Sequence, residues 1–215
     1  MSATFETINE DGILLGISSA VHGMRQPMKS FSRSDTPINC SADDISLGEN
    51  DYNLAKKLVN AGPEHAKYLR MIPVWVDITA PLYFWSEFDT YKIGTTANST
   101  STMHTLSKDN LDEAFCFPRG IMEEADAEFD ELINVLKLIQ EKMKISNNEE
   151  RKKLKVVFKS LLPSCFLYTR TVCLNYQTLQ TMYKQRYSHQ LSEWNTDFVN
   201  WVESLPYSEL ITGKF

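Results

Sequence analysis

Runs of hydrophobic residues divide the chain into a first part with expected strands and a second part with expected helices. The short apolar run at residues 12–21 predicts a buried strand. Residues 71–79 alternate between apolar and other side chains, a pattern that is typical of a half-buried strand. Pro81 is expected to open a helix directly afterwards, because proline is favoured in the first helical turn.

In the rest of the chain the apolar residues repeat with the spacing of an α-helix. Residues 121–143 place their apolar side chains on one stripe and begin with acidic residues, which suit the positive end of a helix dipole. Further helices are expected at residues 149–162, 174–186 and 190–205. Strands followed by helices favour the α+β class. Because we find no internal repeat and no linker, we expect a single domain over residues 1–215.

Composition restricts the kind of function. The chain has 215 residues, of which 42% are hydrophobic and 11% aromatic, so it can bury a sizeable core. Its net charge of −6 argues against a protein that mainly coats nucleic acid or an anionic membrane. A small anionic ligand is compatible with this charge, since it needs only two or three well-placed cations.

The sequence lacks the features of membrane-spanning, secreted and metal-binding proteins. It contains no apolar run of roughly 18 residues and no basic and apolar secretion signal at its start, so we expect a cytoplasmic protein without a membrane-spanning helix. The four cysteines form no Cys-x-x-Cys pair, and the four histidines form no close ligand set. We therefore expect no metal centre.

Two features suggest a ligand site. Residues 94–105 are almost all small and polar, and a solvated loop is the simpler interpretation. The alternative is an anion cradle, because hydroxyls and backbone N–H groups can hold phosphate oxygens. His104 closes this segment and is a candidate ligand contact. Arg186 ends an expected helix and can present its planar guanidinium to a phosphate, a carboxylate or a pyrimidine edge.

Two stretches resemble the flavin-dependent thymidylate synthases, and the resemblance spans roughly residues 12–205. In the first stretch the family has a strand, a helix that begins near a proline, and the motif R-H-R-x-x-S-x-N-E-x-S-x-R-Y. Residues 91–104 read Y-K-I-G-T-T-A-N-S-T-S-T-M-H. Thr96 stands for the first motif serine, Asn98 for the asparagine and Ser101 for the second serine.

The second stretch keeps register over four positions. The family has an arginine, then Leu-Pro, then an asparagine, then a helix that closes on an arginine facing the nucleotide. Here these positions are Lys159, Leu162-Pro163, Asn175 and Arg186. The resemblance implies a mixed or antiparallel sheet packed with long helices, and a homotetramer whose sites lie between subunits.

The chain departs from the family pattern at charged positions. Depending on whether one residue is inserted here, the R-H-R triplet is replaced by Thr90-Tyr91-Lys92 or by Tyr91-Lys92-Ile93. The motif glutamate is Ser99, and the late motif arginine is Met103. The glutamine before the triplet is Glu87, a carboxylate that would repel a neighbouring phosphate unless it were protonated or turned away.

The resemblance implies two alternative functions. In the family, NADPH reduces FAD, and a methylene group passes from methylene-tetrahydrofolate to the uracil ring of dUMP. The first interpretation is a divergent member that binds a pyrimidine nucleotide and carries out this or a related one-carbon transfer. The second is a non-catalytic protein that binds or sequesters a nucleotide, which the lost motif positions favour. A purely structural oligomer with an inert loop is a third interpretation.

Candidate roles follow from the resemblance residue by residue. Arg186 is the candidate catalytic residue, because it could stabilise the activated pyrimidine. The candidate cofactor-binding residues are Lys92, Asn175 and His189. The candidate substrate-binding residues are Glu87, Thr96, Asn98, Ser99, Ser101, His104, Lys159 and Arg186.

Overall fold

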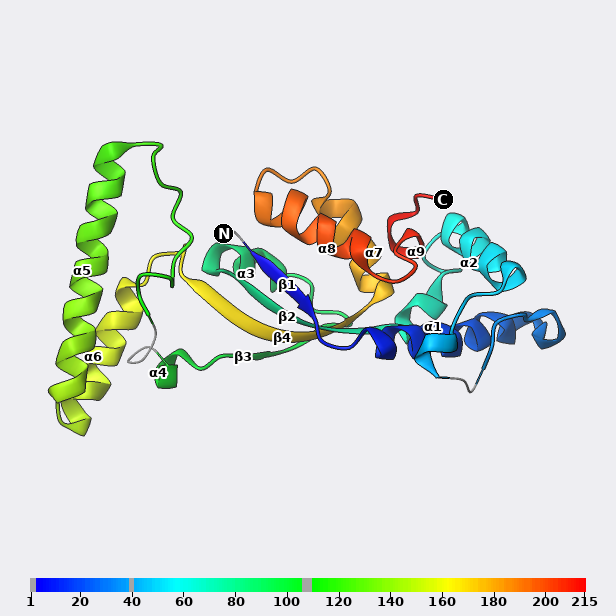
Figure 1. The fold of residues 1–215 in the computed structure, drawn as a ribbon, viewed down its shortest axis with the longest axis horizontal. Helices are drawn as coiled ribbons and strands as arrows, with labels where there is room; N and C mark the ends of the chain where they lie inside the picture. Colours follow the sequence, from blue (N-terminus) through cyan, green and yellow to red (C-terminus); the bar gives the residue numbers. More distant parts are fainter. Residues whose placement is uncertain (1–2, 39–40, 106–109) are drawn as a thin grey trace.

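The chain forms an elongated body with a two-helix arm at one end (Figure 1). The computed structural model describes residues 3–38, 41–105 and 110–215. The sheet formed by these residues is antiparallel and has the strand order β1-β2-β4-β3. Its strands are β1 (Thr4–Thr7), β2 (Pro73–Pro81), β3 (Thr96–Ser99) and β4 (Leu167–Asn175).

Helices follow and flank this sheet, which confirms the expected α+β class. Most predicted helices are present with bounds shifted by a few residues, and the last one begins as a π-helix. The helices outside the arm are α1 (Glu10–Arg25), α2 (Glu49–Ala61), α3 (Leu82–Phe88), α4 (Thr102–Thr105), α7 (Tyr176–Arg186), the π-helix η5 (Glu193–Phe198), α8 (Val199–Ser204) and α9 (Glu209–Thr212). The 3₁₀ turns are η1 (Gln26–Met28), η2 (Phe31–Arg33), η3 (Ala42–Asp44) and η4 (Lys67–Met71).

The first element after β1 corrects the sequence prediction. Residues 12–21, predicted to form a strand, lie inside α1. The side chain of Asn9 caps this helix by accepting a hydrogen bond from the Gly12 N–H at 2.8 Å. The buried apolar residues of α1 are Ile13, Ile17, Ala20, Val21 and Met24. Their spacing of three to four residues is helical, but neighbouring apolar residues conceal it in a short window.

The central strand β4 is not predicted by the sequence. It pairs with β2 over nine residues, from Pro73 opposite Asn175 to Pro81 opposite Leu167. Arg170 occupies a position of β4 that faces the core, with its guanidinium carbon 4.2 Å from the centroid of the Trp85 ring. A charged residue at such a position breaks the alternation that would reveal the strand.

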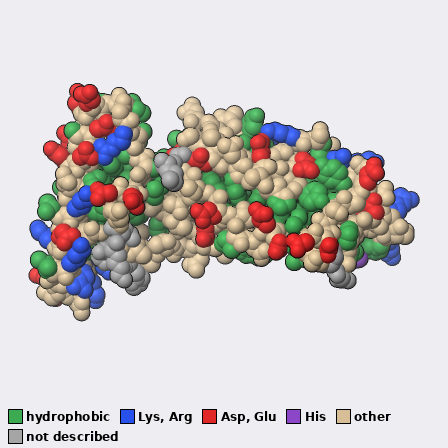
Figure 2. Space-filling view, viewed as in Figure 1, with side chains coloured by type: hydrophobic (Ala, Val, Ile, Leu, Met, Phe, Trp, Pro, Cys, Tyr) green, Lys and Arg blue, Asp and Glu red, His purple; other side chains and the backbone are tan. Residues whose placement is uncertain are grey.

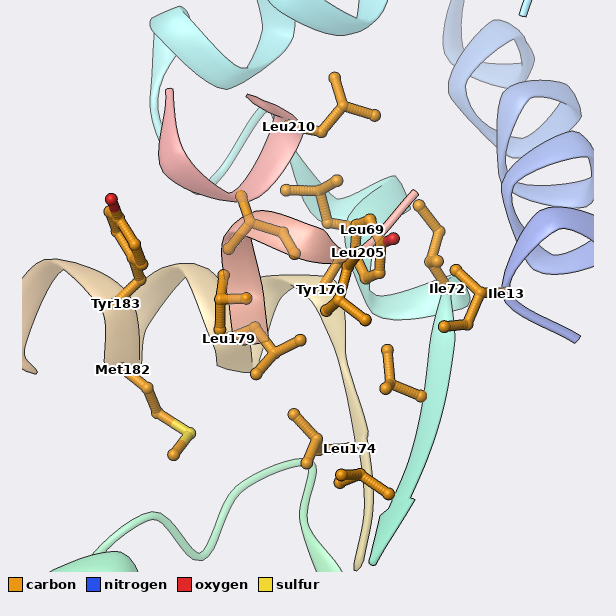
Figure 3. Close-up of a cluster of buried hydrophobic side chains, with 14 of the residues drawn as sticks. Ile13, Leu69, Ile72, Leu174, Tyr176, Leu179, Met182, Tyr183, Leu205 and Leu210 are labelled. Atoms are coloured by element: carbon orange, nitrogen blue, oxygen red, sulfur yellow. The ribbon is translucent and has the colours of Figure 1, made fainter. Parts of the chain in front are cut away.

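Helices cover one face of the sheet and leave the other more open. Figure 3 shows buried side chains from α1, η4, β4, α7 and α9 meeting on the covered face, with Ile13, Leu174 and Leu179 among them. On the other face the side chains are mostly polar. Thr171 donates a hydrogen bond to Asp77 there. The sheet therefore has a covered face and an open face.

The arm consists of α5 (Glu123–Ile145) and α6 (Asn148–Leu161). These helices pack around their own apolar cluster, which includes Phe129, Leu136 and Phe158. Tyr83 and Tyr168 contact both this cluster and the core of the body. Figure 2 shows further apolar side chains exposed between the charged groups of the arm. The exposed set includes Val135, Leu138, Ile145, Val156 and Val157. The single domain expected from the sequence stays a prediction.

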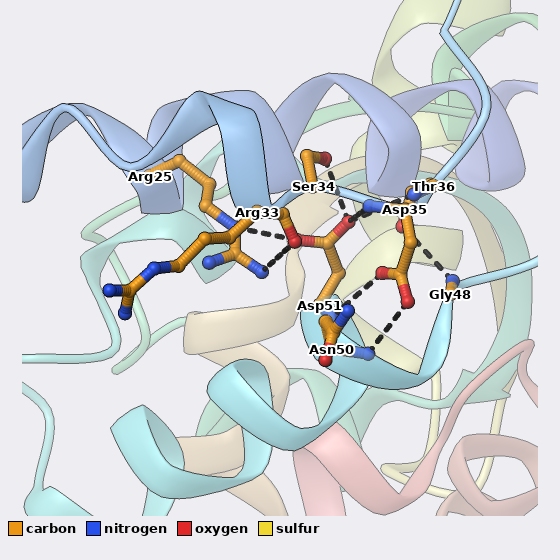
Figure 4. A network of polar contacts seen from close by, with 8 residues as sticks. All are labelled: Arg25, Arg33, Ser34, Asp35, Thr36, Gly48, Asn50 and Asp51. Carbon is orange, nitrogen blue, oxygen red and sulfur yellow. Dashed lines mark hydrogen bonds and ion pairs between the residues drawn. The ribbon is translucent and has the colours of Figure 1, made fainter.

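A buried ion pair joins α1 to α2 (Figure 4). Arg25 Nη2 lies 2.6 Å from Asp51 Oδ1, and the two side chains are 5% and 0% exposed. The second carboxylate oxygen accepts hydrogen bonds from the backbone N–H groups of Asp35 and Thr36, both at 3.0 Å, and from the Ser34 hydroxyl at 2.8 Å. Burial alone would raise the pKa of Asp51, but these hydrogen bonds and the one from Arg25 outweigh it and lower the pKa below its usual value.

Within the part of the chain that the structure describes, no helix is long and apolar enough to cross a membrane.

Candidate functional site

Arg186 lies at the end of α7, where that helix contacts α3. Its Nη1 forms an ion pair with Glu87 Oε2, and its Nε donates a hydrogen bond to the Tyr91 hydroxyl at 2.8 Å. His189 Nε2 lies 3.2 Å from the same Glu87 oxygen. The Arg186 side chain is 15% exposed, so it is largely buried but can still be reached from solvent. The structure thus brings together three candidate residues, Glu87, Arg186 and His189.

Aromatic packing holds this cluster in place. Trp194 lies in the π-helix η5, and its ring stacks on Phe84 of α3 with centroids 4.2 Å apart. The guanidinium carbon of Arg186 lies 4.6 Å from the centroid of the Trp194 ring, a cation–π contact. The buried indole Nε1 of Trp194 has no hydrogen-bond partner among the described residues.

Tyr91 also lines a cleft of 670 Å³, a volume typical of small-molecule sites. Lys92 and Asn175, two candidate cofactor-binding residues from distant parts of the chain, both line this cleft. Residues 90–93, which include both possible replacements of the R-H-R triplet, all line this cleft. Hydroxyls, amides and two cations line the cleft, and none of its described lining residues is acidic.

A close approach between the turn at residues 91–94 and the start of α7 shapes this cleft. Asn175 caps α7 by accepting a hydrogen bond from the Thr178 N–H at 3.0 Å. The Thr178 hydroxyl donates to the Ile93 carbonyl at 3.3 Å. Gly94 has a φ of +75°, and a Cβ on it would lie 2.7 Å from both Asn175 Nδ2 and Thr178 Oγ1. Only glycine fits here without strain.

The substitution Gly94→Ala is expected to destabilise the protein by about 2–3 kcal/mol, since a left-handed alanine costs roughly 1–2 kcal/mol before any clash. Gly120→Ala is the matched control, because Gly120 has a φ of +76° but a Cβ on it would meet nothing within 4 Å. Urea unfolding should show the larger loss for Gly94→Ala. Equal losses would contradict the close approach to α7.

The hydroxyl-rich segment is not one continuous loop, which corrects the loop that both sequence interpretations assume, although residues 96–99 are exposed as a solvated segment would be. Residues 96–99 form the exposed edge strand β3, and residues 102–105 form α4. Thr96, Asn98 and Ser99 are therefore strand residues, paired opposite Cys173, Thr171 and Arg170 of β4. Ser101 is exposed between the two elements. The side chain of His104 lies outside the described residues.

Asn98 and Arg186 belong to opposite faces of the sheet. Directly paired residues on antiparallel strands point to the same face, so Asn98 points the same way as Thr171, onto the open face. Arg186 lies on α7, which packs on the covered face. A single chain therefore does not bring these two candidates into one cleft, and a shared site would need a second copy.

Within one chain, Lys159 also lies far from Arg186. It is exposed near the end of α6, in the arm rather than in the body (Figure 1).

Two of the described cysteines, Cys116 and Cys165, are unsuited to act as nucleophiles. Burial raises the pKa of the Cys165 thiol to about 11, and burial also raises the pKa of Cys116. Both thiols are thus protonated near neutral pH and are poor nucleophiles. Among the described residues, no group of three or more His, Cys, Asp or Glu side chains could hold a metal ion.

Three residues of these sites, Tyr91, Arg70 and Trp194, are not among the candidate residues named from the sequence. Tyr91 stands within the replaced triplet, and that position was a signal that it could face a ligand. Arg70, which lines the cleft, comes from the 3₁₀ turn η4, and Trp194 comes from the π-helix η5. Their contribution depends on packing between elements that are distant in sequence, which no local pattern reports.

The fold resembles that of solved enzymes. A crystal structure of thymidylate synthase X (ThyX) from Helicobacter pylori with FAD and dUMP matches with a TM-score of 0.69 and 17% identity, covering 97% of this chain and 95% of that one. A second structure of the flavin-dependent thymidylate synthase ThyX from the same organism, complexed with FAD and dUMP, matches with a TM-score of 0.66 and 17% identity, covering 98% and 96%. No protein-family model and no curated protein matches the chain. These likenesses confirm the expected fold.

Proposed function

We propose that this chain is a divergent flavin-dependent thymidylate synthase-like protein, with a flavin in the cleft beside Lys92 and Asn175 and a pyrimidine nucleotide at Arg186. The main support is the position of Tyr91. Tyr91 lines the cleft together with Lys92 and Asn175, and its hydroxyl accepts a hydrogen bond from Arg186, so this one residue connects the candidate cofactor residues with the candidate substrate residue. The solved structures that share the fold were crystallised with FAD and dUMP, which agrees with this assignment.

The residues of the cleft fit a flavin nucleotide, which combines a planar ring with phosphate groups. Lys92 and Arg70 supply positive charge, Asn175 supplies an amide, and the 92% exposed side chain of Ile93 offers an apolar surface. Bound FAD would supply hydride transfer, for which NADPH is the proposed reductant. The tight turn at Gly94 would hold this set of donors in place.

The chain's own contribution at the nucleotide is electrostatic. Arg186 would stabilise negative charge that develops on the pyrimidine ring when it accepts a one-carbon unit from methylene-tetrahydrofolate. Its fixed position between Tyr91 and Trp194 means that little reorganisation is needed during the reaction. No covalent enzyme nucleophile is required, in agreement with the protonated thiols.

Assembly into a homotetramer is part of the proposal. The arm exposes apolar side chains on both of its helices, including Leu138 and Val156, and a partner subunit would bury them. The candidate substrate residues Asn98 and Lys159 lie away from Arg186 in one chain, and only a neighbouring subunit could bring equivalent residues to it.

The direct test is a titration of the purified protein with FAD, followed by flavin fluorescence. We expect FAD to bind, and we expect NADPH-dependent conversion of dUMP in the presence of methylene-tetrahydrofolate. Binding of dUMP without flavin binding or turnover would contradict the catalytic proposal and support a nucleotide-binding or nucleotide-sequestering protein.

Glu87 opposes an anionic ligand at Arg186 under both the catalytic and the non-catalytic interpretation. The guanidinium of Arg186 already forms an ion pair with Glu87 of its own chain. A carboxylate at this place competes with an anionic ligand for the arginine and repels a phosphate. Glu87 therefore lowers the affinity that Arg186 would otherwise provide.

The substitution Glu87→Gln is expected to raise the affinity for dUMP about tenfold, equivalent to about 1.4 kcal/mol, because it removes the competing charge. Isothermal titration calorimetry provides the measurement. Asp89→Asn is the control, since Asp89 makes the corresponding ion pair with Arg170. Unchanged or weaker binding by Glu87→Gln alone would show that Glu87 does not oppose the ligand.

A further inference from the structure

Arg70 enters the cleft from η4, and its side chain is oriented by neighbours. Its Nε donates a hydrogen bond to Gln177 Oε1. The amide of Gln177 in turn donates to the Pro63 carbonyl at 3.0 Å. Gln177 is buried and lies in the first turn of α7, so this short chain of hydrogen bonds fixes the direction of the arginine. All three residues line the cleft.

The charge of Arg70 is not neutralised by a carboxylate of the described chain. Arg25, Arg119, Arg170 and Arg186 each form an ion pair with an Asp or Glu. Among the described residues Arg70 has no such partner, and Gln177 occupies only its Nε. The two terminal nitrogens of its guanidinium, Nη1 and Nη2, thus remain available to a ligand.

Lys92 adds a second uncompensated charge to the same cleft. Its amine forms no ion pair among the described residues, and no described lining residue of the cleft is acidic. Two free cations in one cleft stand out in a chain whose net charge is −6. Their local field favours an anion, and the amide and hydroxyl donors nearby add hydrogen bonds to its oxygens.

We propose that Arg70 and Lys92 together bind the phosphate or pyrophosphate group of the nucleotide that occupies this cleft. A guanidinium can bind two phosphate oxygens at once, whereas the lysine acts as a point charge. Arg70 is thus a specificity-determining residue that selects phosphorylated ligands over their unphosphorylated counterparts. The identity of the ligand as a flavin rests on the proposed function, but the preference for a phosphate group does not.

The test compares the wild type with Arg70→Gln, which keeps a polar side chain of similar length. Fluorescence titrations with FAD and with riboflavin measure the effect on a phosphorylated and an unphosphorylated flavin, and calorimetry with ADP provides a probe without a flavin ring. Arg33→Gln is the control for the change in net charge, because Arg33 is exposed and lies outside the residues that line the cleft. Urea unfolding checks that both variants fold.

We expect Arg70→Gln to weaken FAD binding at least tenfold and to leave riboflavin binding unchanged. An equal effect on both flavins, or none, would overturn the role of Arg70 while leaving the proposed function intact. ADP binding that depends on Arg70, without any flavin binding, would support the phosphate site and contradict the proposed function. Failure of the wild type to bind either FAD or ADP would overturn both.

Discussion

Replacing Arg186 with alanine is expected to weaken dUMP binding at least a hundredfold, which corresponds to about 2.7 kcal/mol. The loss removes charge-assisted hydrogen bonds from a largely buried position, where each is worth roughly 1.5–3 kcal/mol. The same substitution leaves Glu87 without its cation, and this carboxylate then repels a phosphate more strongly. Calorimetric titration with dUMP measures the effect.

Arg170→Ala provides a closely matched control for this prediction. Arg170 is 17% exposed against 15% for Arg186, it pairs with Asp89, and it lies over the Trp85 ring as Arg186 lies over Trp194. The two variants should lose comparable stability, but only Arg186→Ala should lose nucleotide affinity. Wild-type affinity in a folded Arg186→Ala protein would show that the nucleotide site has been placed wrongly.

The substitution Asp51→Asn is expected to lower the free energy of unfolding at pH 7 by about 3 kcal/mol. Removing one partner of a buried ion pair leaves the other charge uncompensated, and such losses are typically about 3–5 kcal/mol. Here Arg25 would remain buried with a weaker partner. Urea unfolding measures the change, and Asp43→Asn, at an exposed position, controls for the loss of an acidic group.

The same pair predicts how stability depends on pH. The folded state lowers the pKa of Asp51, so the carboxylate contributes its full stabilisation above the usual aspartate pKa of about 3.9. That contribution is lost as the pH falls through the lower pKa of the folded state. The difference in stability between wild type and Asp51→Asn should therefore shrink in acid. A difference that stays constant down to about pH 2 would contradict the lowered pKa.

Long amphipathic elements could be predicted from the sequence, whereas short or mixed ones could not. The helix α5 repeats its apolar stripe over many turns, so its period is unambiguous. In α1 the run at residues 12–21 contains several adjacent apolar and small residues, which fit a strand and a helix equally well. The sequence does not predict the strand β4, because Arg170 faces the core, where it contacts the Trp85 ring and forms an ion pair with Asp89.

The motif positions indicated two pairs of candidate residues that lie together in the structure, and their roles stay predictions. Lys92 and Asn175 line one cleft, and Glu87 and Arg186 form an ion pair. The relation between Asn98 and Arg186 could not be predicted, because the face on which Asn98 lies depends on its register with Thr171. Such a register is set by pairing between strands that are far apart in the sequence.

The shared position of Tyr91 has a thermodynamic consequence. A ligand in the cleft that moves the side chain of Tyr91 must also disturb the hydrogen bond from Arg186 to the Tyr91 hydroxyl. Occupancy of the cleft and occupancy of the arginine are then coupled equilibria. If the first ligand changes the affinity for the second by some factor, the second changes the affinity for the first by the same factor. The total free energy of binding both ligands therefore does not depend on the order in which they bind.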